Sequence, residues 1–332
     1  MADVARHAGV SAMTVSRALK DETYVSPATR ERILAAVDEL GYVLDQAAGS
    51  LSSKRTGFVA ALVPSINNSN FSDTTRGMSD ALAKRGIQLL LGFTDYSIEN
   101  EERLIEVMLK RRPEGIIITG GTHSERARKL LNNAAIPVVE TWDLPRNPID
   151  SVVGFSNANA ARLMVETLAK KGYRKLGFIG GTTNRDTRGD DRRFGFLEAV
   201  EELSLPADRL VSFGAPPITM LQGGEAMVQM LDRWPDTEAV MCVSDLSAFG
   251  SIMECQRRGW KVPERIAIAG FGNFEVAECS VPSITTIKVD CYGIGYAAAE
   301  KVCEDIVAMR EGGSTTPQTV AVDIEIVERE SA

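Results

Sequence analysis

The chain has 332 residues, of which 44% are hydrophobic and 25% charged, and its net charge is −8. This is ordinary globular composition, and five scattered cysteines without a C-x-x-C pair indicate free thiols in a reducing cytosol. No apolar run approaches the roughly 18 residues of a membrane span, and no charged-then-apolar leader precedes the first helix. We therefore expect a cytoplasmic protein of two or three domains that is neither secreted nor membrane-bound.

The first predicted elements are two short helices joined by a glycine turn. Residues 2–8 read ADVARHA, and Gly9 after them can take a left-handed conformation at a helix end. Ser11 is a good N-cap for the next helix, on which Val15 and Leu19 face one way. This pattern is typical of a helix-turn-helix, whose second helix enters a DNA major groove, although any small helical hairpin shares it.

A third helix follows in the same small unit. Ser26 is its N-cap, Pro27 occupies the first helical position, and Gly41 ends the apolar stripe of ATRERILAAVDEL. Three helices in about 40 residues favour the helix-turn-helix interpretation. They are too few to make up the whole protein.

The charge of this N-terminal region is balanced. Residues 1–56 contain seven Lys/Arg and seven Asp/Glu, so the net charge of −8 lies entirely in the remaining residues. A neutral DNA-binding region predicts modest non-specific attraction to phosphates. Dimerisation would double the contacts.

The segment 44–57, LDQAAGSLSSKRTG, connects this region to the rest of the chain. Asp45 can cap a helix that runs to about Ser52, but such a helix is shorter than the ~12–15 residues that are stable alone in water. Gly49 weakens it by roughly 1 kcal/mol more. The sequence leaves open whether the segment is a plain linker or folds when another molecule holds it.

After Arg55 short apolar runs alternate with amphipathic helices. The predicted strands are 57–64, 87–93, 115–119, 136–140, 175–180, 209–213, 239–243 and 265–271. The predicted helices are 72–85, 97–112, 123–134, 157–171, 191–204, 219–233 and 245–259. Continuous apolar strands with helical crossovers are typical of α/β folds with parallel sheets covered on both faces. The strands form two corresponding sets of four, so we expect two doubly wound lobes with a ligand cleft at the carboxyl ends of their strands.

Several motifs together carry a family resemblance along essentially the whole chain. They are DVARHAGVSAMTVSRAL, YVSPATRERILAAVDELGY, QAAGSLSS, GFVAALVPSINNSNFSDTTRGM, RRFGFLEAV and SITTIKVD. With them the chain resembles the lactose-repressor/purine-repressor family of bacterial transcription regulators. The segments ERLIEVMLKRRPEGIIITGGTH, IPVVETWD, VGFSNANAAR and ECQRRGWKVPERIAIAGF resemble the gluconate-repressor subgroup most.

This resemblance implies a three-part organisation. A helix-turn-helix head would occupy 1–43 and a hinge helix 44–56. A two-lobed periplasmic-binding-protein-like body would occupy 57–332. Within the body, one lobe would comprise 57–155 plus 288–312 and the other 156–287 plus 313–332.

The resemblance also implies which head residues contact operator DNA. Ala12, Met13 and Arg17 would face base edges, where Arg17 can bind guanine with two hydrogen bonds and the other two offer apolar contact. Hydroxyl groups would hold phosphates, which position the protein without reading sequence. The phosphate contacts would be Ser11, Thr14, Ser16, Ser26 and Thr29. In the hinge, Ala48 and Leu51 would reach the minor groove, with Leu51 as a wedge that kinks the duplex.

In the cleft, the resemblance implies an effector site containing Asn70, Phe71, Trp142 and Arg192. The planar fork of Arg192 suits a carboxylate or hydroxyls. Phe71 and Trp142 offer flat faces to a sugar-like chain, although Trp142 can equally be a core residue. The other arginines of RDTRGDDRR, namely Arg185, Arg188 and Arg193, are expected in a solvated loop.

One departure from the family pattern concerns the last strand of the second lobe. The family often has an aspartate there that binds sugar hydroxyls, whereas GFGNF places Gly272 at that position, with Asn273 beside it. A neutral position reduces repulsion of an anion. It therefore favours a sugar acid over a neutral sugar as the effector.

Other functions are disfavoured. Gly293, Gly295 and Ala298 match a dinucleotide-binding fingerprint, but they follow the lobe strands, so close helix packing explains them better. With only two histidines, His7 and His123, and no nucleophile or metal motif, we expect no enzyme, cofactor or metal. The rival class is a sugar-binding receptor of the same two-lobed fold. The helix-turn-helix argues for a regulator, and we expect a homodimer without the heptad tail of a tetramer.

Overall fold

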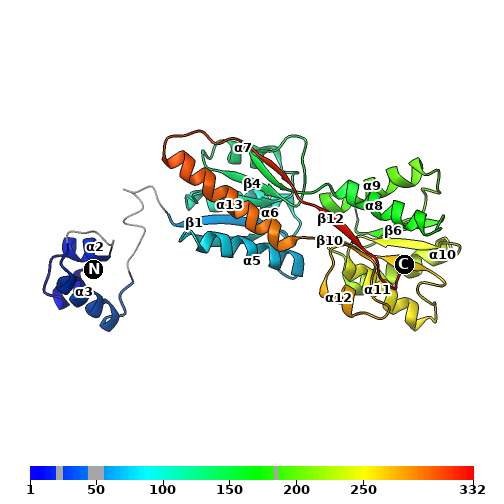
Figure 1. The fold of residues 1–332 in the computed structure, drawn as a ribbon, viewed down its shortest axis with the longest axis horizontal. Coiled ribbons are helices and arrows are strands. Elements are labelled where there is room, and N and C mark those ends of the chain that lie inside the picture. The colour runs from blue at the N-terminus through cyan, green and yellow to red at the C-terminus, as the bar shows by residue number, and fades with distance from the viewer. Residues whose placement is uncertain (20–24, 44–55, 183–185) are drawn as a thin grey trace. The chain divides into compact units, whose positions relative to one another are not determined.

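The computed structural model describes residues 1–19, 25–43, 56–182 and 186–332 (Figure 1). The chain forms two compact units, Met1–Thr56 and Gly57–Ala332. The expected hinge helix, with Asp45, Ala48 and Leu51, lies outside the described residues.

The head consists of three short helices around a small apolar core. The helices are α1 (Ala2–His7), α2 (Ala12–Leu19) and α3 (Pro27–Glu39). The core residues are Val4, Ala5, Ala8, Val15, Ala18, Ile33 and Ala36. Gly9 has a φ of +64° between α1 and α2, the left-handed conformation that the sequence predicted for this turn.

The first lobe is built on a six-stranded parallel sheet in the order β11-β5-β4-β3-β1-β2. Its strands are β1 (Phe58–Val63), β2 (Gln88–Phe93), β3 (Ile116–Thr119), β4 (Val138–Thr141), β5 (Ser151–Gly154) and β11 (Thr319–Ala321). Its helices are α5 (Ser69–Ala83), α6 (Ile98–Lys110), α7 (Glu125–Asn132) and α13 (Cys291–Arg310). Helices α5 and α13 pack side by side, and α6 packs with α7 (Figure 1).

The second lobe is built on a four-stranded parallel sheet in the order β7-β6-β8-β9. Its strands are β6 (Leu176–Gly180), β7 (Leu210–Ser212), β8 (Ala239–Cys242) and β9 (Ala267–Ala269). Its helices are α8 (Asn157–Lys170), α9 (Thr187–Glu202), α10 (Met220–Arg233), α11 (Asp245–Arg257) and α12 (Glu275–Cys279). Helix α8 packs with α9 and α10 with α11, which confirms the predicted fold of two doubly wound lobes.

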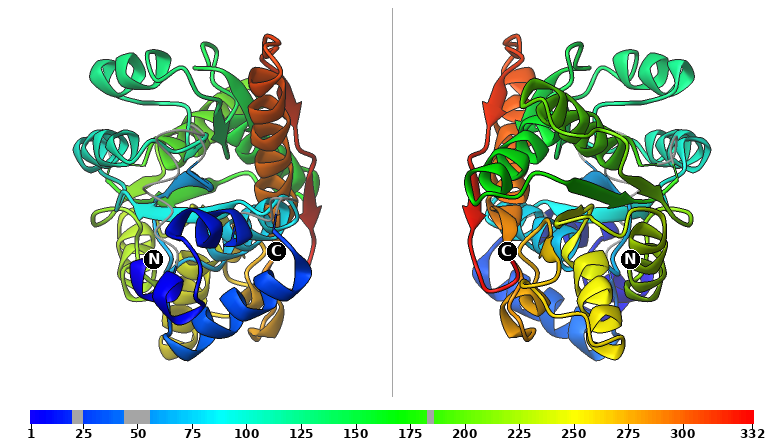
Figure 2. Two further views of the ribbon diagram at one scale, coloured as in Figure 1. Left: turned by 90° about the vertical axis from the view of Figure 1, so that its left-hand side faces the viewer. Right: turned by 90° about the vertical axis from the view of Figure 1, so that its right-hand side faces the viewer.

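The chain passes between the lobes three times, after β5 and along the antiparallel pair β10 (Thr286–Val289) and β12 (Ile324–Val327). The C-terminal segment, red in Figures 1 and 2, runs alongside both lobes. The predicted boundary that put all of 313–332 in the second lobe is wrong, because β11 pairs with β5 in the first sheet. The sequence analysis also missed β5, whose four residues are fewer than a clear periodicity requires. Among the described residues, no helix has the length and apolar character needed to span a bilayer.

Glycines allow α5 and α13 to cross closely. A Cβ atom on Gly295 would lie 1.9 Å from the carbonyl oxygen of Thr74, and one on Gly77 would lie 2.2 Å from that of Tyr292. Ala298 is buried one turn further along α13. The packing of two helices therefore accounts for the dinucleotide-like spacing of these residues.

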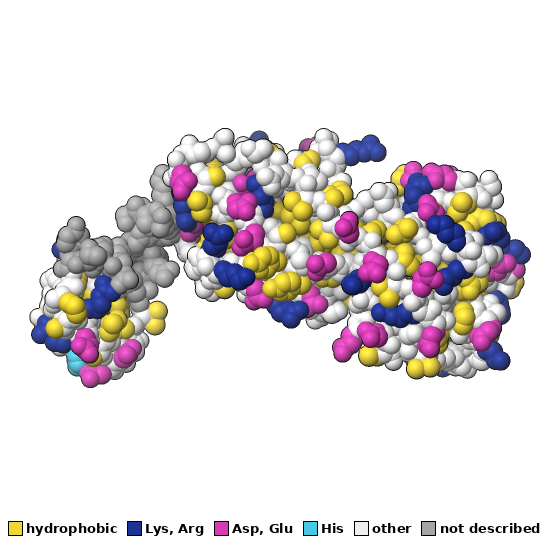
Figure 3. Space-filling model, viewed as in Figure 1, with side chains coloured by type: hydrophobic (Ala, Val, Ile, Leu, Met, Phe, Trp, Pro, Cys, Tyr) yellow, Lys and Arg dark blue, Asp and Glu magenta, His cyan; other side chains and the backbone are white. Residues whose placement is uncertain are grey.

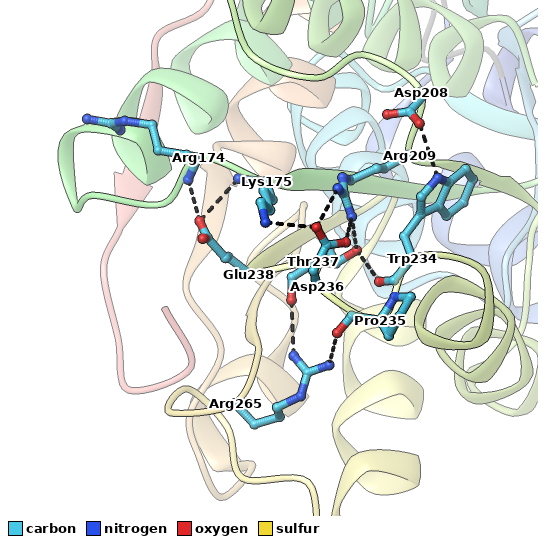
Figure 4. A network of polar contacts seen from close by, with 10 residues as sticks. All are labelled: Arg174, Lys175, Asp208, Arg209, Trp234, Pro235, Asp236, Thr237, Glu238 and Arg265. Carbon is cyan, nitrogen blue, oxygen red and sulfur yellow. Dashed lines mark hydrogen bonds and ion pairs between the residues drawn. The ribbon is translucent and has the colours of Figure 1, made fainter.

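A network of charged side chains ties the amino ends of the strands of the second sheet together (Figure 4). Arg209 donates to both carboxylate oxygens of Asp236, at 2.7 and 3.2 Å, and Lys175 Nζ lies 2.8 Å from the same carboxylate. Glu238 accepts from the backbone N–H groups of Arg174 and Lys175. The arginine and lysine hydrogen bonds hold the pKa of Asp236 well below its usual range. These charges join the amino ends of the strands, which lie at the end of the sheet opposite to the ligand cleft.

We predict that Gly295→Ala destabilises the body by about 1–3 kcal/mol, because the added methyl group overpacks the contact between α13 and α5. Urea unfolding measures the change, and Ser79→Ala on the exposed face of α5 is the matched control. Equal stability of both variants would contradict the close crossing.

Candidate functional site

The exposed face of α2 carries the three residues predicted to meet base edges. Ala12, Met13 and Arg17 are exposed, and Met13 has 63% of its surface accessible, which is unusual for a large apolar side chain. On the opposite face, Val15 and Ala18 are buried against the other two helices. The helix therefore presents its predicted contact residues together on one surface.

The predicted phosphate contacts gather at two helix N-termini. Ser11 Oγ accepts from the backbone N–H of Thr14 at 3.1 Å, and Ser26 Oγ accepts from that of Thr29 at 3.3 Å. Each threonine hydroxyl also lies within hydrogen-bond distance of its serine, and Ser16 is partly exposed on α2. Helix N-termini attract anions, so α2 and α3 can each approach a phosphate.

The body contains a cavity at the carboxyl ends of both sheets, where doubly wound folds bind ligands. Residues from both lobes line it. Four of the predicted effector residues line it, namely Asn70, Phe71, Trp142 and Arg192. The polar residues that the sequence analysis missed there are Asn68, Tyr96, Asp186, Arg188 and Ser244.

Gly272 and Asn273 are not among the described residues that line the cavity. Asn273 Oδ1 accepts from Arg329 at 2.8 Å and is thereby used within the second lobe. Gly272 has a φ of +116°, and its carbonyl accepts from Asn70 Nδ2 at 3.2 Å. A Cβ atom on Gly272 would lie 2.6 Å from that nitrogen, so glycine permits this contact between the lobes.

A chain of aromatic rings runs from the first lobe to the second. The ring centroids of Phe71 and Trp142 are 5.1 Å apart, those of Trp142 and Phe155 5.8 Å, and those of Phe155 and Phe271 6.1 Å. Trp142 Nε1 donates to Thr74 Oγ1 at 3.1 Å. Trp142 therefore belongs to the hydrophobic core and to the cavity wall at once.

Arg192 is a buried cation in the cavity wall. Its guanidinium carbon lies 4.2 Å from the centre of the Phe271 ring, and Nη1 donates to Asn157 Oδ1 at 3.0 Å. Nη2 is 3.7 Å from Asp186, whereas Nε has no hydrogen-bond partner in the described part of the chain. Burial lowers the pKa of Arg192.

Arg188 was expected in a solvated loop, and that prediction is wrong. Helix α9 begins at Thr187, so Arg188 and Arg192 are spaced i, i+4 and share one face. Arg188 is buried, lines the cavity and lies near the rings of Phe71 and Tyr96, at 5.7 and 5.9 Å. This helical spacing is the signal that sequence reasoning could have used.

The same prediction is wrong for Arg193, which lies in α9, is partly buried and donates to the carbonyl of Gly181. Arg185 lies outside the described residues.

Asp186 places a carboxylate in the cavity wall, although this chain has Gly272 where the family often has an aspartate. Asp186 Oδ1 is 3.5 Å from Arg188 Nη2 and has no hydrogen-bond partner among the described residues. Burial and the nearby charge of Asp186 raise the pKa of Tyr96 to about 12, so its phenol stays protonated and can donate. Two guanidinium groups against one carboxylate leave the wall positive, which suits an anion that also carries hydroxyls.

A histidine next to this region is buried between two glutamates. His123 Nδ1 is 2.7 Å from Glu101 and Nε2 is 3.3 Å from Glu140. Burial lowers the pKa of His123, but the hydrogen bonds and charges of the glutamates outweigh it and raise the pKa to about 9. The imidazolium joins α6 and β4 to the loop after β3.

We predict that the free energy of unfolding falls as the pH rises from 6.5 towards 9. A raised folded-state pKa gives full stabilisation below 6.5, and this is lost as the pH passes through about 9. The shift corresponds to roughly 3 kcal/mol, at about 1.4 kcal/mol per pKa unit. Urea unfolding at both pH values measures the decline, which should be smaller in His123→Gln than in the wild type. The same decline in both proteins would contradict the role of His123.

The described surface differs from the cavity wall in its charge pattern. On the face of the body in Figure 3, acidic and basic side chains are interspersed, as is typical of a solvated surface. A helix-turn-helix head, together with a two-lobed body that has a polar and aromatic cavity at the carboxyl ends of its sheets, defines a ligand-responsive DNA-binding regulator.

Comparisons with known proteins agree with this class. Residues 1–45 match the family described as bacterial regulatory proteins, lacI family, and residues 165–332 match the periplasmic binding protein-like domain. The HTH-type transcriptional regulator GntR of Pseudomonas aeruginosa is 34% identical over 331 residues, which are 99% of this chain and 94% of that protein. The chain therefore belongs to the LacI family of bacterial regulatory proteins.

Solved structures show the same relationship. The crystal structure of a LacI-family transcriptional regulator from Silicibacter pomeroyi is 34% identical, with a TM-score of 0.92 over 99% of this chain and 98% of that one. A structure of the transcriptional regulator CelR with cellobiose is 27% identical, with a TM-score of 0.72 over 99% and 98% of the two chains. The relatives named GntR confirm the predicted likeness to the gluconate-repressor subgroup. Because the LacI family consists of transcription regulators, membership in it confirms the prediction that the chain is not an enzyme.

Proposed function

We propose that the chain is a homodimeric, cytoplasmic repressor of genes for the use of a carbohydrate or sugar acid, and that a sugar acid such as gluconate releases it from its operator. The positive cavity wall, with Arg188 and Arg192 against Asp186, is the observation that carries the choice of a sugar acid. The CelR structure holds cellobiose, a neutral sugar. Two buried guanidinium groups, those of Arg188 and Arg192, would bind an anionic ligand more strongly than a neutral sugar.

The proposed division of labour follows the head, hinge and body boundaries of the sequence analysis. In the head, 1–43, Ala12, Met13 and Arg17 contact bases, while Ser11, Thr14, Ser16, Ser26 and Thr29 contact phosphates. Ala48 and Leu51 of the hinge, 44–56, enter the minor groove. Each head of a dimer supplies one half-site of a two-fold symmetric operator.

Within the proposed effector site, Asn70, Phe71, Trp142 and Arg192 contact the ligand, joined by Arg188 and Asp186. Gly272 and Asn273 act indirectly, through the contact of Gly272 with Asn70 and the packing beside it.

Release would operate through the hinge. The hinge segment 45–52 has eight residues, which are too few for a helix that is stable alone, and it folds when two copies pair on DNA. Closure of the cleft around a ligand would move the two first lobes and remove that pairing. Shifting the operator from nearly full to nearly empty requires the ligand to prefer the released form by about 10⁴-fold, or roughly 5.5 kcal/mol.

Fluorescence anisotropy tests this proposal with a palindromic duplex that the full-length protein selects from a random library. We expect tight binding at low salt and dissociation when sodium gluconate is added. Absence of any selected duplex would contradict the regulator. Tighter binding with gluconate would reverse the switch and make the ligand a corepressor.

Arg17→Ala is predicted to relax base preference at one operator position. A good bidentate contact with guanine contributes roughly 1–3 kcal/mol of discrimination. Repeating the selection with the variant measures this preference. Uniform weakening on all duplexes would instead make Arg17 a phosphate contact.

Arg192→Ala is predicted to abolish the rise in melting temperature that gluconate causes, while operator binding without ligand remains. The rise occurs because a ligand that binds only the folded state stabilises it. Arg233→Ala, on the outer surface of the second lobe, is the control and should keep the full rise. A variant at Arg192 that also keeps it would exclude Arg192 from the site.

A further inference from the structure

Asn157 lies where the chain crosses from the first lobe to the second. It is the first residue of α8, follows β5 closely, and is 1% exposed. It lies outside the set of described residues that line the cavity. Its side chain nevertheless makes one hydrogen bond towards each lobe: Nδ2 donates to the carbonyl oxygen of Trp142 at 3.0 Å, and Oδ1 accepts from Arg192 Nη1 at 3.0 Å.

The chemistry of the two partners determines which way the amide points. A guanidinium only donates and a backbone carbonyl only accepts, so the oxygen of Asn157 must face Arg192 and its nitrogen Trp142. A side chain at this position must therefore donate at one end and accept at the other. Aspartate has the same shape, but its ionised carboxylate cannot donate to the carbonyl of Trp142.

Both partners of Asn157 are held firmly. The N–H of Trp142 donates to the carbonyl of Val153 at 3.2 Å, and its indole is fixed between two aromatic rings. On the other side, α8 and α9 touch so closely that a Cβ atom on Gly195 would lie 2.1 Å from the carbonyl oxygen of Ala158. The path from Arg192 through Asn157 to the first lobe is therefore tightly packed.

Arg192 also has unused hydrogen-bonding capacity in the cavity wall. Its Nε and the Oδ1 of Asp186 are buried and without hydrogen-bond partners among the described residues. Such groups are costly unless something binds them, so a ligand with a carboxylate and hydroxyls fits here. That ligand would act on the same guanidinium that Asn157 holds from its other side.

We propose that Asn157 is a positioning residue that couples ligand binding at Arg192 to the placement of the first lobe, through the carbonyl of Trp142. The inference rests on the proposed function and adds to it the residue that transmits the signal. In its absence, ligand binding and operator release become separate events. Asn157→Asp keeps the shape and the acceptor for Arg192 and removes the donor to Trp142, which suits measurements without ligand. Because it also adds a negative charge beside Arg192, the neutral variant Asn157→Ser is used wherever gluconate is present.

The first experiment uses full-length protein, sodium gluconate as the probe and the duplex selected by the wild type. Calorimetry measures the Kd for gluconate, and anisotropy measures operator affinity with and without it. Asn159→Ser, the same change on an exposed residue of the same helix turn, is the matched control. We expect Asn157→Ser to bind gluconate within about fivefold of the wild type, yet to change operator affinity less than twofold at saturation, while the control responds like the wild type.

Two results would overturn the proposal. Operator release by Asn157→Ser equal to that of the wild type would show that Asn157 transmits nothing. Loss of gluconate binding in Asn157→Ser, as strong as in Arg192→Ala, would make Asn157 part of the ligand site.

A second measurement requires no ligand and separates this proposal from the choice of effector. Hydrogen exchange of the ligand-free protein reports on residues 139–143, where we expect at least tenfold faster exchange in Asn157→Asp and no change in Asn159→Asp. Unchanged exchange in Asn157→Asp would overturn the link. If the wild type ignores gluconate, the proposed effector fails while this exchange result still decides the coupling. Asn157→Ser is measured in the same way if the aspartate variant does not fold.

Discussion

Burying a guanidinium between two lobes costs free energy unless its donors find partners, and Arg192 meets this constraint only in part. Asn157 holds one terminal nitrogen, the face of Phe271 lies 4.2 Å from the guanidinium carbon, and Nε has no hydrogen-bond partner in the described chain. An anion in the cavity would supply a hydrogen-bond acceptor for Nε of Arg192. The fold places this charge at the carboxyl ends of two parallel sheets, beside the crossing from β5 to α8. A ligand bound here contacts both lobes, so its binding can change the position of one lobe relative to the other.

Other charges of the body serve stability and lie elsewhere. Arg209 has Asp236 oxygens on both terminal nitrogens at the amino edge of the second sheet (Figure 4), and His123 is paired with Glu101 and Glu140. Both ring nitrogens of His123 and both terminal nitrogens of Arg209 have carboxylate partners, and neither side chain lines the cavity, although Arg209 Nε also has no hydrogen-bond partner among the described residues. Incomplete pairing therefore indicates a binding site only together with a place in the cavity wall, which Arg192 and Asp186 have and Arg209 does not.

The sequence predicted the three head helices, eight strands of the two sheets and four cavity residues, because helix caps and continuous apolar strands are local signals. It missed β5, β10, β11 and β12, which are short and depend on pairing partners distant in the chain. Arg188 was misassigned because the start of α9 was placed four residues too late, which hid its i, i+4 relation to Arg192. The hydrogen bonds of Asn157 could not be predicted from the sequence, because their partners, Trp142 and Arg192, lie 15 and 35 residues away along the chain.

The comparison of gluconate with glucose by calorimetry tests the central claim most directly. Both molecules have six carbons, but gluconate is an open chain with a carboxylate at C1, whereas glucose is a neutral pyranose ring. The account predicts that the full-length protein binds gluconate about 10- to 100-fold more tightly, since charge-assisted hydrogen bonds to a buried arginine contribute roughly 1.5–3 kcal/mol, and 1.4 kcal/mol is a factor of ten. Equal affinity for both sugars, or a preference for glucose, would contradict it.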